Sequence, residues 1–410
     1  MAPNPDFRSA AEHGLMTGPP PYPPERLVSL ANWQDPPFSR WGFQHIRDLI
    51  PTARVPRGDG PVWELPRAER DLSGIRVPWA GGDAELEAFL TETYTDGLLV
   101  LHRGRIVHEE YRNGMGPAST HLLMSVSKSV VSAVCGVLVG EGRLSPADLV
   151  TTHLPELAGT SWDGCTVRHL LDMRAGTRFD EDYANLDADV RVYEQIYQWR
   201  PRIDPSLPAD VTAYYPTLVN DGPHGGPFRY RSILTDVLGW VMERAGGDRL
   251  ANLVSSRLWA PMGAEVDADF TVDGHANAMA DAGLCVSLRD LGRFGLLMAS
   301  GGRCNGRQVV PEAWIRDTLT PDPDSRDAYL ASDPDPEQRA HGSYYRNQFW
   351  VFDAAAPIWR CSGINGQHVV IHGPAEVVIA KLSTWPVAMA DDLSIGTRTA
   401  LLALAEAVAG

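Results

Sequence analysis

The sequence predicts an α+β fold in which one antiparallel sheet, flanked by helices, is assembled from both ends of the chain and carries a mostly helical insertion. Strand patterns appear over residues 97–112 and again within the last hundred residues, whereas residues 146–285 are mostly helical or irregular. Because early and late strands flank a helical middle, they can join one sheet covered by helices. A cleft between sheet and insertion is the natural place for a functional site.

The chain of 410 residues exceeds what one simple core usually needs, so more than one structural unit is expected. Residues 1–30 are rich in Pro and Gly and are expected to form an extended segment over the surface. Residues 31–145 together with 286–410 are expected to form the sheet domain. Residues 146–285 are expected to form the helical insertion domain.

Hydrophobic period and turn signals predict the elements of the first three quarters of the chain. A short helix is expected over 83–95, and a hairpin over 97–112 turns at Arg103-Gly104. The residues from Ser125 to about Val139 are apolar or small nearly all round, which predicts a buried helix. Further helices are expected near 165–173, 187–199, 232–245, 248–258 and 287–300.

The last hundred residues alternate strand signals with turns and end in a helix. Residues 321–337 carry Pro, Asp and Glu with little apolar content, which predicts a surface loop. A C-terminal helix is expected from about 391 to 408. The expected strands cover 347–353, 357–361, 366–372 and 375–383.

Composition excludes several classes of function. A formal net charge of −16 and a pI of about 5.2 argue against nucleic acid and anionic membrane surfaces as partners. No apolar run approaches the ~18 residues of a transmembrane helix, and the N-terminus lacks the basic and apolar regions of a secretory signal. The five cysteines are scattered without a CxxC pair, which predicts a reduced, cytoplasmic protein with free thiols.

Lysine is rare in this chain. Of 36 basic residues only Lys128 and Lys381 are lysines. Arginine cannot be deprotonated in proteins, so a position that keeps lysine is a candidate for proton transfer. Lys381 lies in a strand pattern without a nearby nucleophile, and we expect it to be structural and to face solvent.

Lys128 has a nucleophile one helical turn away. It follows Ser125 by three residues, so both side chains lie on one face of the predicted helix. Burial and the helix dipole both lower a lysine pKa at this position, and a neutral lysine is a competent general base. The pair therefore predicts Ser-Lys nucleophilic catalysis. The alternative is structural, with Ser125 as an N-cap and Lys128 extending to water.

Other catalytic motifs are absent from the sequence. No serine is flanked as G-x-S-x-G, and the stretch from His108 to Arg112 lacks the second histidine of a zinc protease helix. Neither lysine follows a phosphate-binding glycine loop. We therefore expect no metal and no organic cofactor.

Several motifs resemble the class C β-lactamase-like serine hydrolases, a family that includes D-Ala-D-Ala peptidases, esterases and hydrolases of nylon oligomers. The resemblance is greatest to the nylon-oligomer branch and extends from about residue 32 to the C-terminus. It implies a serine β-lactamase-like fold. The matching stretches are NWQDPPFSRWGF (32–43), HLLMSVSKS (121–129), EGRLSPADLVTTHLPELAG (141–159), EDY (181–183), FRYRSILTDVLGW (228–240), SGINGQ (362–367) and KLSTWP (381–386).

The resemblance implies catalytic roles residue by residue. Ser125 becomes the acylated nucleophile, Lys128 its base, and Tyr230 a proton relay to the leaving amine. The backbone N–H groups of Ser125 and Ile364 form the oxyanion hole. Cys361-Ser362-Gly363 stands where the family has Lys-Thr-Gly, and the loss of that lysine argues against a true β-lactamase.

The resemblance also suggests which residues bind substrate. Tyr183 matches the tyrosine that favours amide over ester cleavage, and Ser232 replaces the asparagine of the β-lactamases. An acidic group in the following stretch can pair with a substrate ammonium, and the candidates there are Asp187, Asp189 and Glu194. Of these, Glu194 is chosen by its spacing from Tyr183. Asp281 and Trp350 are further pocket candidates.

These expectations define a serine hydrolase that cleaves linear amides of the 6-aminohexanoate-oligomer type through an acyl-enzyme on Ser125. The alternative is a carboxylesterase for short acyl esters with the same site. A third hypothesis is a non-catalytic sensor of the penicillin-binding type that retains the fold. The expected partner is a small-molecule amide or ester, without nucleic acid or membrane, and the resemblance allows a homodimer.

Overall fold

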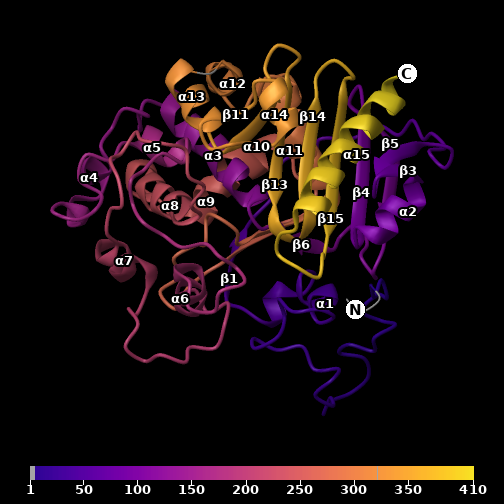
Figure 1. The fold of residues 1–410 in the computed structure, drawn as a ribbon, viewed down its shortest axis with the longest axis horizontal. Coiled ribbons are helices and arrows are strands. Elements are labelled where there is room, and N and C mark those ends of the chain that lie inside the picture. The colour runs from indigo at the N-terminus through magenta and orange to yellow at the C-terminus, as the bar shows by residue number, and fades with distance from the viewer. Residues whose placement is uncertain (1–4, 321) are drawn as a thin grey trace.

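The computed structural model describes residues 5–320 and 322–410, and its central feature is a seven-stranded antiparallel sheet (Figure 1). Its order, β11-β12-β13-β14-β15-β4-β5, places the last strand of the chain beside β4. This sheet from both ends of the chain confirms the predicted α+β fold. The strands are β4 (Thr95–His102), β5 (Arg105–Tyr111), β11 (Tyr344–Arg346), β12 (Phe349–Asp353), β13 (Ile358–Gly363), β14 (Gln367–His372) and β15 (Val377–Ser383).

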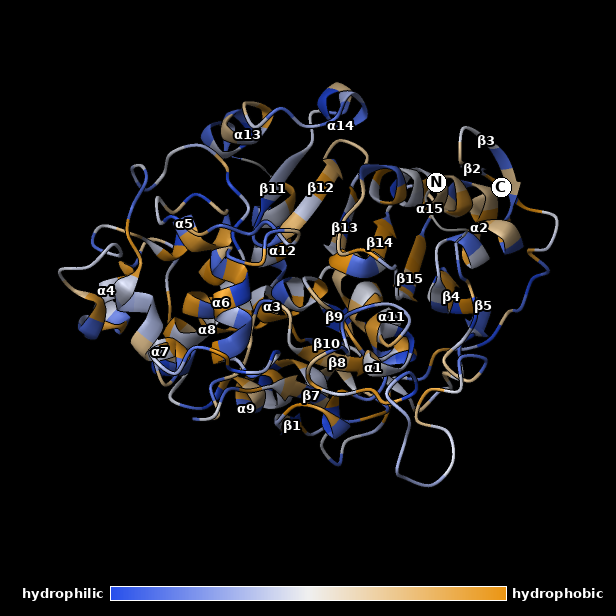
Figure 2. Ribbon diagram, turned by 60° about the horizontal axis from the view of Figure 1, so that its bottom comes forward, coloured by the Kyte–Doolittle hydropathy of each residue, from blue (hydrophilic) through white to orange (hydrophobic). Residues whose placement is uncertain are grey.

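Helices cover both faces of the sheet. The helices α2 (Leu86–Glu92) and α15 (Asp391–Ala409) pack on one face. The helices α3 (Val126–Gly140) and α11 (Leu288–Ala299) pack on the other face. Figure 2 shows the hydrophobic residues concentrated in the central strands and in the helices against them, with hydrophilic loops at the rim.

Strand β4 shows why the sheet is buried on both sides. Leu98 and Val100 belong to the core under α15, whereas Leu99 and Leu101 belong to the opposite core with α11. Successive side chains of a strand point to opposite faces, so a continuous apolar run fits a sheet covered twice. The hairpin turns at Arg103 and Gly104, as predicted, and both residues have positive φ, 51° and 71°.

The middle of the chain is mostly helical and lies beside the sheet (Figure 1). It also contains a strand, β7 (Ala268–Thr271), of a small four-stranded sheet in the order β1-β7-β8-β6. The other strands of this sheet are β1 (Thr52–Val55), β6 (Thr120–Leu122) and β8 (Leu284–Ser287). The helices are α4 (Val150–His153), α5 (Val167–Leu171), α6 (Asp189–Ile196), α7 (Val211–Tyr214), α8 (Ile233–Gly246), α9 (Leu250–Val254) and α10 (Ala260–Met262).

The surface loop predicted over 321–337 is wrong for its described residues. The helix α13 (Pro323–Leu330) and the start of α14 (Pro336–Ala340) lie there, whereas residue 321 lies outside the described residues. Each helix begins after an aspartate whose side chain accepts backbone N–H groups, and proline follows that aspartate. This N-cap signal outweighs the low apolar content.

The remaining elements are short. Within 1–30, residues 5–30 form turns and irregular chain, and residues 1–4 lie outside the described residues. The division into 31–145 with 286–410 and 146–285 stays a prediction. The short elements are α1 (Ser39–Gly42), β2 (Arg76–Trp79), β3 (Gly82–Glu85), β9 (Arg303–Cys304), β10 (Arg307–Gln308) and α12 (Glu312–Leu319).

Lys381 was expected to face solvent, and this prediction is wrong. Its side chain is fully buried in β15, where its ammonium group donates to Ser383 Oγ and lies 3.4 Å from the carbonyl oxygen of Thr93. Burial lowers the pKa of Lys381 to about 7, against the attraction of Asp96. The strand is covered by helices on both sides, so the usual solvent-facing position does not exist here.

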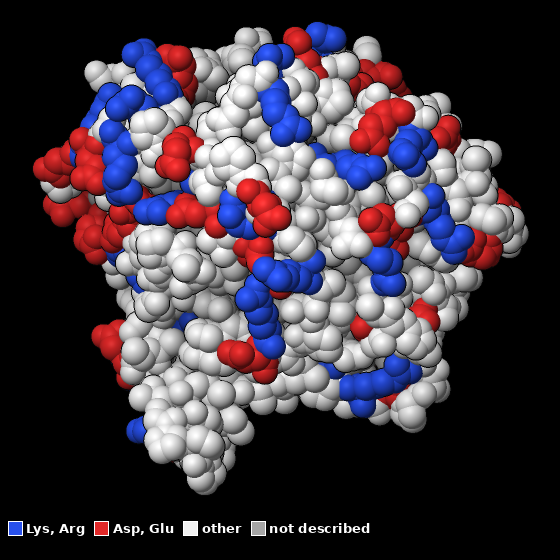
Figure 3. Space-filling model, turned by 180° about the vertical axis from the view of Figure 1, so that it is seen from behind, with Lys and Arg blue, Asp and Glu red and all other residues white. Residues whose placement is uncertain are grey.

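Charged side chains are mixed over the surface. On the face opposite to that of Figure 1, basic and acidic side chains lie next to one another over much of the surface (Figure 3). Exposed side chains of opposite charge also form ion pairs, such as Arg103 with Glu376 at 2.6 Å. Among the described residues, no helix combines the length and the apolar character that crossing a membrane requires.

Candidate active site

Ser125 lies at the start of α3, directly after a residue with left-handed backbone. Met124 has a φ of 48°, which turns the chain from β6 into the helix. Ser125 occupies the N-cap position, yet its side chain makes no capping hydrogen bond. Instead, its Oγ accepts a hydrogen bond of 2.9 Å from Lys128 Nζ. The structure thus brings the predicted pair together.

Lys128 is buried and held by four contacts. Its Nζ donates to Ser125 Oγ and Ser232 Oγ, both at 2.9 Å, and to the carbonyl oxygen of Asp281 at 3.1 Å. Asp281 Oδ2 lies 3.4 Å away. Because only 1% of Lys128 is exposed, the alternative in which it extends to water does not describe this structure.

The expected neutral amine is a wrong prediction for the resting protein. Burial opposes the charge of Lys128, but Tyr230, Asp281 and Glu181 surround it and together hold its pKa above the ordinary value. The negative charges of these groups therefore favour the ammonium form of Lys128. The helix dipole and burial act as the sequence suggests, and the acidic groups that outweigh them come from distant segments.

The two lysines make these opposite shifts testable by NMR. In protein labelled with ¹³Cε-lysine, we expect one signal with a midpoint near pH 7, from Lys381, and one that keeps its ammonium form to pH 10 or above, from Lys128. The Lys381→Met variant assigns the signals. A midpoint near pH 7 for Lys128 would restore the neutral-amine hypothesis.

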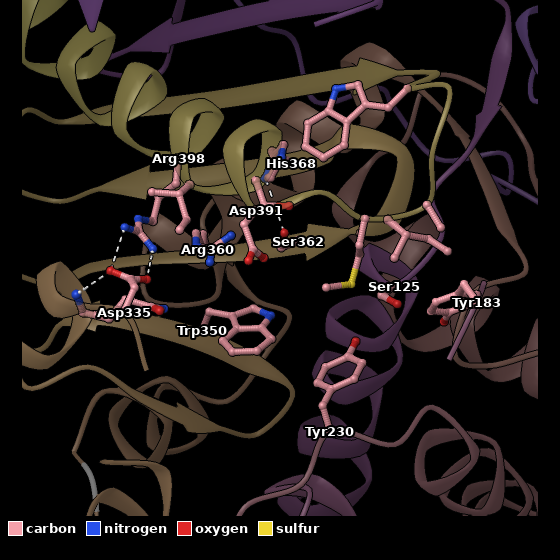
Figure 4. A pocket seen from close by; sticks show the side chains of 18 of the residues that line it. Ser125, Tyr183, Tyr230, Asp335, Trp350, Arg360, Ser362, His368, Asp391 and Arg398 are labelled. Carbon is pink, nitrogen blue, oxygen red and sulfur yellow. Dashed lines mark hydrogen bonds and ion pairs between the residues drawn. The ribbon is translucent and has the colours of Figure 1, made fainter. Parts of the chain in front are cut away.

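Tyr230 lies three residues before α8 and directs its hydroxyl towards Ser125 (Figure 4). Its ring stacks on Trp350 at 5.6 Å between centroids, and its centroid lies 5.2 Å from Lys128 Nζ. Burial raises the pKa of Tyr230, whereas the charge of Lys128 works to lower it. Tyr230 is thus placed to exchange a proton with Ser125 under the influence of Lys128.

Glycine permits the close approach of β13 to the nucleophile. A Cβ atom on Gly363 would lie 2.7 Å from the carbonyl oxygen of Leu123 and 3.0 Å from the backbone N of Ser125. A side chain at this position would therefore push the strand away from Ser125. Ile364, the next residue, lines the same cavity as Ser125, which agrees with the expected oxyanion hole of two backbone N–H groups.

A cavity of about 620 Å³ opens in front of Ser125. Tyr183 lies on one side of Ser125 and Trp350 on the other (Figure 4). Residues from the helical middle, the sheet and α15 all contribute to the walls. They include Ser125, Glu181, Tyr183, Tyr230, Trp350, Arg360, Ser362, Ile364, Asp391 and Arg398.

Three of the proposed substrate-binding residues are placed differently from the expectation. Glu194 is not brought to the cavity, because its carboxylate is buried in ion pairs with Arg191 and Arg200 at 2.9 and 2.5 Å. Ser232 and Asp281 lie behind the cavity wall, where they contact Lys128. Trp350 and Tyr183 line the cavity as expected.

Glu181 is a candidate that the sequence reasoning missed. Its carboxylate accepts hydrogen bonds from Tyr183 Oη at 2.8 Å, Ser232 N at 2.6 Å and Ser232 Oγ at 2.5 Å. Burial raises the pKa of Glu181, and the charge of Lys128 opposes this. A chain of hydrogen bonds thus runs from Ser125 through Lys128, Ser232 and Glu181 to Tyr183. In the sequence, Glu181 is marked only by its position two residues before Tyr183, in the EDY stretch.

Within residues 5–320 and 322–410, no group of three or more His, Cys, Asp or Glu side chains is arranged to hold a metal ion. The chemistry that these residues can support is acyl transfer. A serine with an adjacent ammonium and a tyrosine can attack a carbonyl carbon beside two backbone N–H groups.

Together, the fold and the Ser125–Lys128–Tyr230 group define a serine hydrolase with β-lactamase-like architecture. Sequence comparison agrees, since residues 84–404 match the Beta-lactamase family, and the chain belongs to this family. It is 38% identical over 358 residues to 6-aminohexanoate-dimer hydrolase from Paenarthrobacter ureafaciens, which covers 87% of this chain and 88% of that protein. The resemblance inferred from the motifs is thereby confirmed.

Solved structures show the same fold. A candidate 6-aminohexanoate-dimer hydrolase from Bacillus anthracis has a TM-score of 0.83 at 24% identity, and the match covers 95% of this chain and 99% of that one. A family VIII carboxylesterase has a TM-score of 0.57 at 15% identity, covering 77% and 95% of the two chains.

Proposed function

We propose that this protein is a serine amidohydrolase that cleaves linear amides of the 6-aminohexanoate-oligomer type through an acyl-enzyme on Ser125. The observation that carries this proposal is the 2.9 Å hydrogen bond from Lys128 to Ser125 Oγ in a cavity that Tyr183 and Tyr230 also line. The name of the relative at 38% identity supports the class of substrate.

In the acylation step, Ser125 Oγ attacks the amide carbonyl carbon while its proton passes to Tyr230. Burial keeps the Tyr230 hydroxyl in its neutral form, so it passes its own proton to the nitrogen of the leaving amine as it accepts the proton of Ser125. The ammonium group of Lys128 stabilises the negative charge that develops on the phenol oxygen during this transfer. The negative charge that develops on the carbonyl oxygen is stabilised by the N–H groups of Ser125 and Ile364. Each such donor is typically worth about 10²–10³ in rate.

The C–N bond breaks as the amine nitrogen takes up the proton from Tyr230. Water then attacks the acyl-enzyme, Tyr230 accepts a proton from this water while it passes its own proton to Ser125 Oγ, and the carboxylic acid is released. Ser232 and Asp281 keep Lys128 in place during both steps through their contacts with Nζ.

A carboxylesterase with the same catalytic group is the alternative function. One contact favours the carboxylesterase: the Tyr183 hydroxyl donates its hydrogen bond to Glu181 rather than into the cavity. An ester leaving group needs less protonation than an amine, so an esterase would not depend on the Tyr183 hydroxyl.

The test combines an amide with an ester. The purified protein is expected to release free amine from the linear 6-aminohexanoate dimer, and protein whose serine is blocked by a phosphonate reagent serves as the blank. Because Tyr183 matches the tyrosine that favours amide over ester cleavage and lines the cavity, we expect Tyr183→Phe to lower kcat/KM for the dimer by about 10²-fold, the size typical of a lost catalytic group. Hydrolysis of p-nitrophenyl acetate should change less than about threefold.

The control is Tyr22→Phe, which removes an exposed hydroxyl bonded only to the carbonyl oxygen of Gly18 among the described residues. It should leave both reactions unchanged. Equal losses on amide and ester in Tyr183→Phe would contradict the assigned role of Tyr183. Ester hydrolysis without any amine release would favour the carboxylesterase.

We further propose a cytoplasmic location, with a small-molecule amide or ester as the partner and a homodimer as the assembly. The cysteines support a reducing compartment, because all five belong to the described part of the chain and each is free and buried.

A further inference from the structure

One arginine in the cavity wall has no anionic partner. Arg360 lies on β13, three residues before Gly363, and lines the cavity that contains Ser125. Its guanidinium lies over the ring of Trp350, 5.6 Å from the centroid. Within the described residues it forms no hydrogen bond and no ion pair.

The neighbouring charges explain why the Arg360 guanidinium has no ion-pair partner in the described part of the chain. Arg398 on the same wall is paired with Asp335 Oδ2 and Glu337 Oε2, both at 2.6 Å. The carboxylates of Asp335 and Glu337 are therefore already paired with another arginine. Figure 4 shows Arg360 between this Arg398–Asp335 pair and Ser362.

The remaining polar groups do not neutralise Arg360. Asp333 and Asp391 also line the cavity, but both are exposed and neither hydrogen-bonds to the guanidinium. His368 adds no positive charge, because burial and the nearby Arg360 hold its pKa well below the ordinary value. Burial and the charge of Arg398 lower the pKa of Arg360 to about 10. Arg360 is half-buried in the cavity wall, so its guanidinium is open to pairing with an anionic ligand in the cavity.

We propose that Arg360 binds the free carboxylate at one end of a linear substrate, whose methylene chain lies along Trp350 between Arg360 and Ser125. The inference rests on the proposed function for its location beside Ser125. It narrows the substrate class to amides or esters that carry a terminal carboxylate on the Trp350 side of the scissile bond. A guanidinium fits a carboxylate through two parallel hydrogen bonds, which gives both affinity and orientation.

The test measures binding directly and needs no turnover. Dissociation constants of hexanoate and hexanamide, which differ mainly in charge, are obtained from ligand-observed NMR titrations of the wild-type protein. We expect hexanoate to bind about tenfold more tightly than hexanamide, as a charge-assisted pair allows. Arg360→Gln should remove this difference by weakening hexanoate alone, and Arg360→Lys should retain part of it.

Arg103→Gln is the matched control, since Arg103 is exposed and lies outside this cavity. It should leave both constants unchanged. Equal binding of hexanoate and hexanamide to the wild-type protein would overturn the proposal, as would an Arg360→Gln variant that weakens both ligands equally. If Arg360→Gln does not fold, the wild-type protein is titrated in 0.5 M NaCl instead. Weaker binding of hexanoate with unchanged binding of hexanamide would support the charge pairing. Unchanged binding of hexanoate would contradict it.

The outcome is distinguishable from failure of the proposed function. A protein that prefers hexanoate through Arg360 but releases no amine from the dimer retains the carboxylate site and loses the amidohydrolase assignment. If amine is released but substitution of Arg360 does not change hexanoate binding, the amidohydrolase assignment stands and the carboxylate site is rejected.

Discussion

Ser125→Ala is expected to abolish hydrolysis of amides and esters together, lowering kcat by about 10⁴-fold or more, as loss of a nucleophile does in other serine hydrolases. The Ser125 hydroxyl is the cavity group that Lys128 contacts and that the mechanism acylates. Alanine leaves the helix start intact because Ser125 makes no capping bond. The measurements are amine release from the 6-aminohexanoate dimer and p-nitrophenol release from its acetate.

Ser132→Ala on the same helix is the matched control. Ser132 Oγ donates to the carbonyl oxygen of Asn347 at 2.6 Å, within the core. Its replacement should lower stability while kcat/KM stays within about threefold, as expected for loss of one neutral buried hydrogen bond. Mass spectrometry after phosphonate treatment should find Ser125 modified. Residual activity in Ser125→Ala, or modification at another serine, would move the nucleophile elsewhere.

Lys128→Arg is expected to lower kcat by about 10³-fold or more although it preserves the positive charge, a loss at the upper range for a group that assists proton transfer. The compact ammonium group reaches Ser125 and Ser232 at 2.9 Å each inside a closed space. A planar guanidinium is larger and cannot make the same tetrahedral contacts. Lys128→Met should lose as much, because it removes the charge that stabilises Tyr230.

Folding must be separated from chemistry in these variants. Thermal unfolding and circular dichroism identify a Lys128 variant that is merely unfolded, and binding of hexanamide reports an intact cavity. A folded Lys128→Arg protein with more than about a tenth of wild-type kcat would contradict a direct role, because such a role is worth at least 10²-fold. The role in proton transfer would then be assigned to Tyr230 alone.

Local spacing predicted the parts of the site that are local. Ser125 and Lys128 are three residues apart in one helix, so their contact follows from helical geometry. The ion pair of Glu194 with Arg191 is equally local, since the two residues lie three positions apart on α6, and this spacing was a missed signal against Glu194 as an amine-binding residue.

Long-range contacts could not be read in the same way. Glu181 reaches Ser232 across 51 residues, and no periodicity in the sequence indicates that contact. The pKa of Lys128 was predicted in the wrong direction for the same reason, since Tyr230, Asp281 and Glu181 converge only in the folded chain. The strands were predicted well because their apolar runs are local, whereas the polar helices α13 and α14 were missed.

The neighbouring positions of β4 and β15 have a consequence for synthesis of the protein. A ribosome makes β4 about 280 residues before its partner, so this apolar strand has to wait for the end of translation with one edge unpaired. A nascent chain that has passed Tyr230 already contains the nucleophile, the lysine and the tyrosine, but not yet Ile364. Activity should therefore appear only after the C-terminal strands and α15 leave the ribosome, and chaperones that shield exposed strands would act on the nascent chain until then.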